Sequence, residues 1–281
     1  MMILIEYGDK MKIVTEPTVT IIAKQVFLGH PDYPIPDDGN DATKIGAFAA
    51  KGCYDSFGAE GRANEENQLA ILEHQHGSVL EHINFTLFIE GITRGLSLES
   101  NRHRPLAVSQ RSTRYTAEED ASIVLEPYFA KLWNKYKPFI ALEKDDITEI
   151  GDFNIDELNF IVSHISSLEE SFHAYQKDVM WLMKMNPLSL SGFDLRKWAR
   201  GKARNVLPHA LETRITYTGN IRAWRWFIEA RSDRHAEPEI RRLADVILNV
   251  LRKEADIYFS DFEVAEIYDD IPVWVPKYSK V

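Results

Sequence analysis

The sequence predicts a mixed α/β protein, because patterns typical of strands and patterns typical of amphipathic helices both occur along the chain. Residues 18–27 are β-branched and mostly apolar, and residues 83–89 alternate between two kinds of side chain, as strands do. Apolar residues at steps of three and four indicate a long helix over 161–182 and a C-terminal helix over 240–251. A chain of 281 residues, 44% of them hydrophobic, can bury the core of one large domain or two small ones.

The segments between these elements carry signals for loops and for one more helix. Residues 28–43 contain three prolines among several Asp, Asn and Gly residues, which predicts a surface loop. Residues 64–76 follow as a short helix with apolar side chains on one side. Seven acidic residues and one lysine lie in residues 143–157, which predicts a solvated loop rather than a catalytic pair of carboxylates. The long helix should end at Asn186, because the proline that follows disfavours a helical conformation there.

Composition limits the compartment and the partners. With 33 Lys and Arg residues against 43 Asp and Glu residues, the net charge of −10 should repel nucleic acid. No stretch reaches the ~18–20 consecutive apolar residues of a membrane helix, and the N-terminus has no basic region or cleavage site. We therefore expect a soluble, cytoplasmic protein that binds neither membrane nor nucleic acid. Its single cysteine, Cys53, forms no intramolecular disulfide and is expected to be a small buried or half-buried residue rather than a nucleophile.

Several familiar catalytic patterns are missing from the sequence. His74 and His76 are two positions apart, not the three or four that align metal ligands on a helix, and no H-E-x-x-H occurs, so no metal site is expected. There is no G-x-S-x-G elbow of a serine hydrolase. Neither the glycine pattern of a P-loop nor G-x-G-x-x-G lies near the arginines described next.

Positive charge is concentrated in two segments of this acidic chain. Residues 94–115 hold five arginines against one acid, and residues 200–242 hold ten Lys and Arg residues against five acids. Each arginine alone is more typical of a solvated face or a salt bridge, but the clusters indicate an anion site, because guanidinium groups bind phosphate bidentately and keep their charge. In the first segment Pro105 favours extended backbone, and Ser109, Gln110, Ser112 and Thr113 supply the small donors typical of phosphate cradles.

The same segment resembles the signature of the flavin-dependent thymidylate synthases. Arg102-His103-Arg104, seven residues and then Ser112 reproduce RHR-x7-S, and residues 109–115 (SQRSTRY) are similar to the continuation of that signature. Residues 76–91 and 203–244 are similar to two further blocks of the family, in the right order and spacing. The resemblance covers most of the chain from about residue 45 to 250.

The resemblance implies an α/β fold with a central antiparallel sheet flanked by helices. It implies a single domain over residues 1–281, with a divergent acidic loop near 141–165 that matches nothing in the family. It further implies non-covalent FAD and a homotetramer whose active sites are shared between subunits. The implied reaction is the reductive methylation of dUMP to dTMP, with methylenetetrahydrofolate as one-carbon donor and NADPH as reductant.

By matching position, the resemblance also implies three groups of site residues. FAD would be contacted by Ser78, Glu81, Arg102, His103, Arg104, Asn220 and Arg222. The nucleotide would be held by Glu99, Gln110, Ser112, Arg114, Arg204 and Arg231. The expected catalytic residues are Arg231, Ser112 and His76. Arg231 would stabilise negative charge that develops on the uracil ring, and His76 would lie near the flavin.

Four residues depart from the family's usual pattern: Glu99 for a glutamine, Gly201 for an acid, Trp226 for a histidine or asparagine, and Glu237 for a glutamine. An ionised Glu99 beside a phosphate would be repulsive unless an arginine such as Arg102 pairs with it. These changes leave open a divergent enzyme that transfers a methyl or hydroxymethyl group to another pyrimidine nucleotide such as dCMP. From a different class, a nucleic-acid-binding protein would use the arginines as a basic patch, which the net charge opposes.

Overall fold

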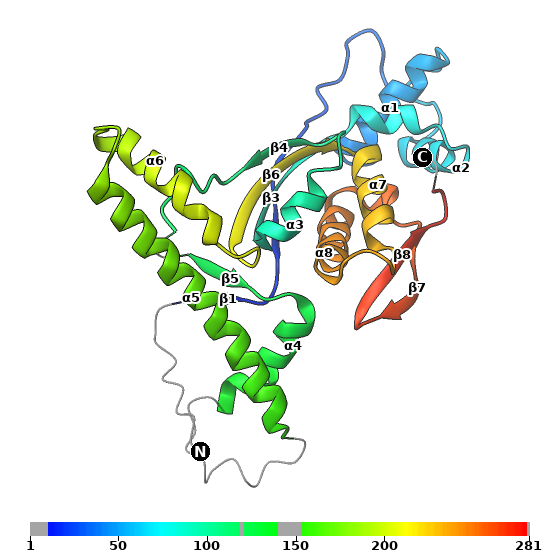
Figure 1. The fold of residues 1–281 in the computed structure, drawn as a ribbon. Helices are drawn as coiled ribbons and strands as arrows, with labels where there is room; N and C mark the ends of the chain where they lie inside the picture. Colours follow the sequence, from blue (N-terminus) through cyan, green and yellow to red (C-terminus); the bar gives the residue numbers. More distant parts are fainter. Residues whose placement is uncertain (1–10, 119–120, 140–152, 280–281) are drawn as a thin grey trace. The chain divides into compact units, whose positions relative to one another are not determined.

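The computed structural model describes residues 11–118, 121–139 and 153–279 (Figure 1). These residues form two compact units, each built from segments that lie far apart in the sequence. Unit 1 consists of Met1–Glu16, Gly91–Ser97 and Arg111–Thr213, and unit 2 of Pro17–Glu90, Leu98–Gln110 and Arg214–Val281. The chain therefore passes from one unit to the other several times.

The largest sheet lies mainly in unit 2. Its order is β2-β3-β6-β4, from Thr18–Lys24, Asn84–Thr93, Glu212–Asn220 and Ala107–Gln110. β2 runs antiparallel to β3, and β4 runs antiparallel to β6. Phe85, Leu87 and Ile89 of β3 are at most 2% exposed, because alternate side chains of a strand point to opposite faces. Both predicted strands are confirmed, and so is the antiparallel sheet flanked by helices.

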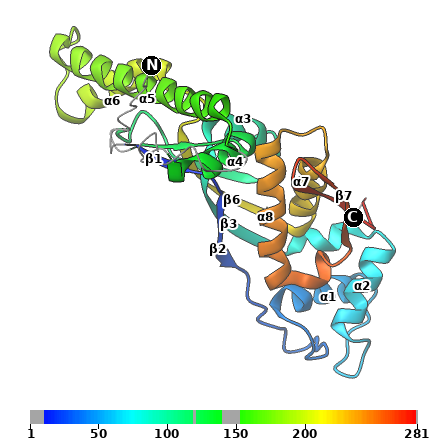
Figure 2. The ribbon, with the colours of Figure 1, turned by 90° about the horizontal axis from the view of Figure 1, so that it is seen from below.

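Helices and a hairpin complete unit 2. α7 (Ile221–Ser232) packs against α8 (Pro238–Ala255), and the hairpin of β7 (Phe262–Tyr268) and β8 (Ile271–Pro276) lies beside them (Figure 2). The apolar stripe predicted for the C-terminal helix is at most 1% exposed on α8, which confirms that helix. The remaining elements are α1 (Asp41–Cys53), α2 (Asn64–Glu73) and the 3-10 helices η1 (Gly77–His82) and η5 (Asp256–Tyr258).

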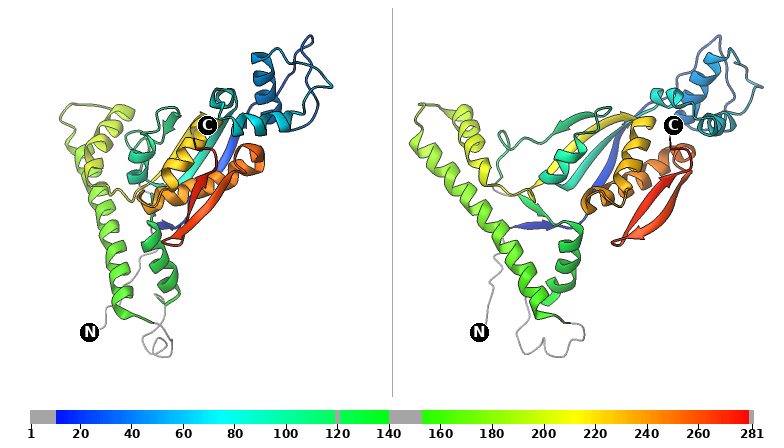
Figure 3. Two further views of the ribbon diagram at one scale, coloured as in Figure 1. Left: turned by 90° about the vertical axis from the view of Figure 1, so that its right-hand side faces the viewer. Right: turned by 45° about the vertical axis from the view of Figure 1, so that its right-hand side comes forward.

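Unit 1 is mostly helical. The long helix α5 (Ile155–Met185) packs against α4 (Pro127–Tyr136) and α6 (Gly192–Ala203) (Figure 3). The short strands β1 (Lys12–Val14) and β5 (Ser122–Val124) pair in parallel, and η2 (Lys137–Phe139) and η4 (Arg204–Val206) are 3-10 turns. α3 (Arg94–Ser100) begins in unit 1 and ends in unit 2. Among the described residues, no helix combines the length and the apolar character that crossing a membrane requires.

The region around α1 differs from the sequence prediction. The loop expected over 28–43 ends at Asn40, whose side chain caps α1 by accepting a hydrogen bond from the Thr43 amide at 3.0 Å. The sequence pattern missed α1 because its buried side consists largely of small residues such as Ala47 and Ala50 rather than large apolar ones. Cys53, expected to be at least half-buried, is exposed because it is the last residue of α1, at the end of the helix.

Two other helix boundaries also differ. The helix predicted over 64–76 ends at Glu73, because Gln75 adopts a left-handed conformation with φ of 58°. The acidic loop predicted near 141–165 is helical from Ile155, where the Asn154 side chain accepts a hydrogen bond from the Asp156 amide at 2.9 Å. Residues 140–152 of that segment lie outside the described residues.

The C-terminal part of α5 ends where the sequence predicts, but its apolar stripe is not buried over the whole predicted length. Asn186 ends the helix in a left-handed conformation with φ of 36°. The stripe predicted over 161–182 is buried only as far as Tyr175. Beyond it the chain exposes a group of large apolar side chains, namely Met180, Trp181, Met185 and Leu188.

Candidate functional site

The RHR segment lies in unit 2 between α3 and the edge strand β4. Amide-to-carbonyl hydrogen bonds from Arg102 to Glu99 (3.0 Å) and from His103 to Ser100 (3.1 Å) form tight turns here. Arg102 and Arg104 are exposed, whereas His103 is only 2% exposed. The segment therefore offers two arginines to a ligand and buries the histidine between them.

Packing against β6 fixes this segment. The Tyr217 hydroxyl lies 2.7 Å from the Ser100 hydroxyl and donates to the Asn101 side-chain oxygen at 2.9 Å, and burial raises the pKa of Tyr217 to about 12. Leu106, whose amide donates to the His103 carbonyl at 3.1 Å, packs over Gly219 so closely that a Cβ at Gly219 would overlap its side chain. Sequence reasoning missed Tyr217, because a buried tyrosine in a strand gives no signal of its own.

Arg231, in the last turn of α7, binds directly to His103. The Arg231 Nε donates to His103 Nε2 at 2.7 Å. The imidazole also lies against the rings of Trp226 and Phe227, with centroid distances of 4.4 and 4.6 Å. Burial and the charge of Arg231 lower the pKa of His103 to about 4. His103 is therefore neutral at pH 7, and its Nδ1, which then carries the proton, is buried without a hydrogen-bond partner among the described residues.

Glu99, the acid that replaces a usual glutamine, lies next to the same arginine. Arg231 Nη2 donates to the Glu99 carbonyl at 3.2 Å, and Nη1 lies 3.7 Å from the Glu99 carboxylate. The expected partner, Arg102, is not the one that the structure pairs with this carboxylate. Within unit 2, Glu99 and His103 thus both contact Arg231, although up to 132 positions separate them from it in the sequence.

A second group in unit 2 forms where η1 meets the start of α7. The Ile221 amide donates to the Ile83 carbonyl at 2.9 Å and joins the two elements. Asn220 caps α7 by accepting from the Ala223 amide at 2.8 Å, and Arg222 forms an exposed ion pair with Glu81 at 2.5 Å. Ser78 and His76, also exposed, lie within and just before η1. Four predicted FAD residues, Ser78, Glu81, Asn220 and Arg222, are therefore brought to one place.

Unit 1 holds the predicted phosphate residues. The Ser112 hydroxyl accepts from the Arg114 amide at 3.3 Å. Arg114 lies over Gly201 of α6, where a Cβ would be 3.6 Å from its Nε, so this departure places no acid beside Arg114. Arg204, exposed, follows α6 directly. Gln110, by contrast, ends β4 in unit 2, opposite Ile215.

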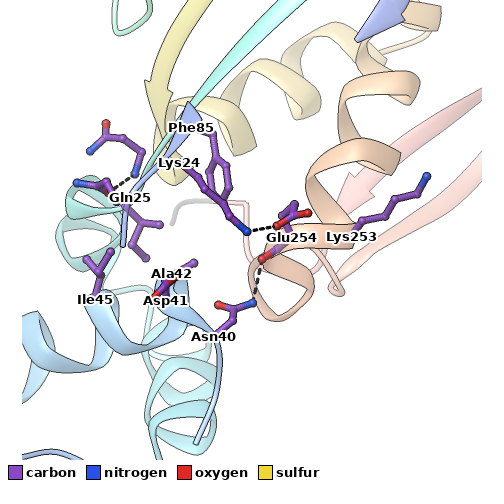
Figure 4. Close-up of a pocket in the computed structure, with 11 residues that line it drawn as sticks. Lys24, Gln25, Asn40, Asp41, Ala42, Ile45, Phe85, Lys253 and Glu254 are labelled. Atoms are coloured by element: carbon purple, nitrogen blue, oxygen red, sulfur yellow. Dashed lines mark hydrogen bonds and ion pairs between the residues drawn. The ribbon is translucent and has the colours of Figure 1, made fainter. Parts of the chain in front are cut away.

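A cavity lies elsewhere in unit 2. It has a volume of about 250 Å³ and lies between the end of β2, the start of α1 and the end of α8 (Figure 4). Lys24 points to Glu254 across it, with their nitrogen and oxygen 2.6 Å apart, and Asn40 donates to the Glu254 carbonyl. No residue predicted for FAD or nucleotide lines this cavity, and it has no part in the candidate site.

Comparison with known proteins gives one consistent result. Residues 37–256 match the family described as "Thymidylate synthase complementing protein". The chain is 36% identical over 266 residues to a flavin-dependent thymidylate synthase of Mycobacterium leprae. The aligned region covers 91% of this chain and 93% of the relative. It is 35% identical over 259 residues to the protein of the same name from Mycobacterium tuberculosis, with the same coverage of both chains. The matched range spans the positions of all the predicted site residues.

The neutral state of His103 is testable by NMR. We expect the nitrogen resonances of its imidazole, assigned by comparison with His103→Gln, to report a neutral ring with the proton on Nδ1 at pH 6 and protonation only near pH 4. The unfolded chain has a histidine pKa of about 6.5 and binds this proton first. The contribution to the free energy of unfolding is therefore complete above about pH 6.5 and is lost as the pH falls towards 4. A cationic His103 at pH 6 would contradict this assignment.

Proposed function

The chain belongs to the flavin-dependent thymidylate synthase family, and we propose that it converts dUMP to dTMP by reductive methylation. Methylenetetrahydrofolate would supply the carbon, NADPH would be the reductant, and FAD would be the bound cofactor. The observation that carries the proposal is the RHR-x7-S signature within a match that spans residues 37–256. These substrates are metabolites of the cytoplasm, where we propose that the enzyme acts.

The residues of unit 2 fit a flavin dinucleotide. Arg102 and Arg104 are exposed cations that suit a pyrophosphate, and Arg222 follows the capped N-terminus of α7, where a helix favours anions. The buried Nδ1 of His103 is an unused donor that a carbonyl or ring nitrogen would satisfy. FAD, when bound, supplies hydride transfer, so the protein needs to bind and orient rather than provide a strong nucleophile.

We assign the nucleotide to the residues that match the family's nucleotide-binding positions. Ser112, Arg114 and Arg204 would bind the phosphate dianion through charge-assisted hydrogen bonds, with Gln110 as a further donor. Arg231, held by His103 and by the Glu99 carbonyl, would keep a fixed cation beside the pyrimidine ring, where negative charge develops during reaction. His76, exposed before η1, would lie near the flavin.

A homotetramer with active sites shared between subunits is part of this proposal. The support lies in the far end of α5, where Met180, Trp181 and Met185 are each more than half exposed. Apolar side chains gathered on a surface in this way are typical of protein interfaces. A second copy of the chain is the occupant that we propose for this face.

One observation favours a second candidate function. The carboxylate of Glu99 lies 3.7 Å from Arg231, which we place beside the pyrimidine ring. A carboxylate accepts a hydrogen bond from the exocyclic amine of cytosine, whereas uracil offers a carbonyl at that position. The alternative is therefore transfer of a methyl or hydroxymethyl group to a cytidine nucleotide such as dCMP.

The main proposal predicts flavin binding and turnover together. Purified protein titrated with FAD should show a bound-flavin spectrum near roughly 450 nm. The loaded enzyme should form labelled dTMP from labelled dUMP only when methylenetetrahydrofolate and NADPH are both present. An enzyme that binds no FAD at micromolar concentration would contradict the proposal. Tight, salt-dependent binding of duplex DNA in its place would support the nucleic-acid alternative.

Removing either of the two arginines assigned to the phosphate should weaken the binding of dUMP. We expect Arg114→Ala and Arg204→Ala to reduce the binding free energy by about 1.5–3 kcal/mol each, the range for hydrogen bonds to charged groups. Calorimetric titration measures this directly. Arg196→Ala, on the exposed side of α6, serves as the matched control and should bind dUMP like the wild type. Unchanged affinity in both test variants would show that the phosphate binds elsewhere.

Glu99→Gln separates the two nucleotides. For a dUMP enzyme, loss of the carboxylate should strengthen dUMP binding by about 1 kcal/mol. The repulsion between the carboxylate and a negative charge of the nucleotide is ~4 kcal/mol at 4 Å, and about a quarter of it remains after solvent screening and pairing with Arg231. For a dCMP enzyme, the same change should weaken the binding of dCMP and leave the binding of dUMP nearly unaffected. Binding of both nucleotides to wild type and variant decides between them, and no change for either would remove Glu99 from the site.

A further inference from the structure

A buried acid in unit 1 lies at the end of the loop that carries Ser112 and Arg114. The loop runs from Arg111 to Glu118, and arginine side chains bind its backbone at three points. Arg94 donates to the Arg111 carbonyl at 3.0 Å. Arg111 itself donates to the Ala117 carbonyl at 3.3 Å, and Arg200 of α6 donates to the Tyr115 carbonyl at 3.1 Å. The loop is thus tied down by cations from within it and from α3 and α6.

Glu118 is the acid that lies within this cluster of arginines. Its side chain is fully buried, and one carboxylate oxygen lies 2.8 Å from Arg111 Nη1. This contact is an ion pair without the alignment of a regular hydrogen bond. Burial raises the pKa of Glu118, while Arg111, Arg94 and Arg200 act to lower it. A buried carboxylate is costly unless cations compensate it, so the acid and the arginines hold each other in place.

The arginines need this acid as much as it needs them. Burial is the main cause that lowers the pKa of Arg94, and the charges of Arg204 and Arg111 add to that effect. Glu118 alone opposes it among these groups. Without the carboxylate, Arg94 and Arg111 would be like charges held close together in a partly buried place. Repulsion would then move the arginine side chains and the loop that they bind.

We propose that Glu118 is a positioning residue for the nucleotide phosphate. It does not touch the ligand, because it is fully buried behind Arg111. It acts through the loop, by fixing the place of Ser112 and Arg114 through Arg111 and the backbone contacts of Arg94 and Arg200. This inference rests on the proposed function, which assigns Ser112, Arg114 and Arg204 to the phosphate.

Glu118→Gln keeps the shape of the side chain and removes its charge. We expect the variant to raise the Kd and KM for dUMP about tenfold, as expected when one charged contact is lost, with a smaller change in kcat. The FAD spectrum should be unchanged, because the FAD residues lie in unit 2. Hydrogen exchange of the amides of residues 112–117, measured without ligand, should be faster than in the wild type.

Two further variants keep the test decisive. Glu157→Gln is the matched control, since it breaks an exposed ion pair with Lys135 in the same unit and should leave dUMP binding and loop exchange unchanged. Arg111→Lys keeps the charge but changes the reach of the donor, and it should weaken dUMP less than Glu118→Gln does. If Glu118→Gln does not fold, the Arg111→Lys variant decides. Faster hydrogen exchange of the loop together with weaker dUMP binding supports the proposal, whereas exchange rates and affinity equal to those of the wild type overturn it.

The outcomes also separate this inference from the proposed function. A Glu118→Gln variant with normal loop exchange, or with faster exchange but unchanged affinity for dUMP, overturns the positioning role. A wild-type enzyme that does not bind dUMP contradicts the proposed function. In that case the exchange rates of residues 112–117 still decide whether Glu118 fixes the loop.

Discussion

The pairing of β3 with β6 is the constraint on which the candidate site depends. Each strand buries one face, and each leads directly into a functional segment: β3 into α3 and the RHR segment, and β6 into α7. The Ile221 amide, bonded to the Ile83 carbonyl, joins the end of β6 to the start of β3. Tyr217 of β6 reaches the turn just before Arg102. Two adjacent strands thus hold segments together that lie more than one hundred residues apart.

Three arginines in or next to the candidate site form ion pairs, and the pairs differ in burial and therefore in the free energy that they contribute. Arg222 with Glu81 is exposed, and pairs of this kind contribute about 0–1 kcal/mol. Arg231 with Glu99 is partly buried, and Arg111 with Glu118 includes a fully buried carboxylate, so breaking the latter is far more costly. The exposed pair is free to exchange its partner for a ligand, whereas the buried pair serves as a fixed support. A chain of net charge −10 in this way supplies partners for three of these local cations.

Sequence patterns predicted what depends on neighbours along the chain. A β-branched apolar run found β2, alternation found β3, the period-3.6 pattern found α5 and α8, and the RHR-x7-S motif identified the family. They missed α1, because alanine and glycine make a weak apolar stripe, and they placed a loop where α5 begins. The partner of Glu99 and the burial of His103 and Glu118 follow from packing between distant segments. No local pattern encodes such contacts, so the departure at Glu99 was visible in the sequence but its partner was not.

Gly219 shows how a position without any contact to a ligand can restrict the evolution of a site. Any side chain there would displace Leu106, whose amide is bonded to the carbonyl of His103. A side chain at Gly219 therefore requires Leu106 to become smaller or to take another side-chain conformation, so the two positions are coupled. The turn that carries the RHR segment is linked in this way to the absence of a side chain on β6.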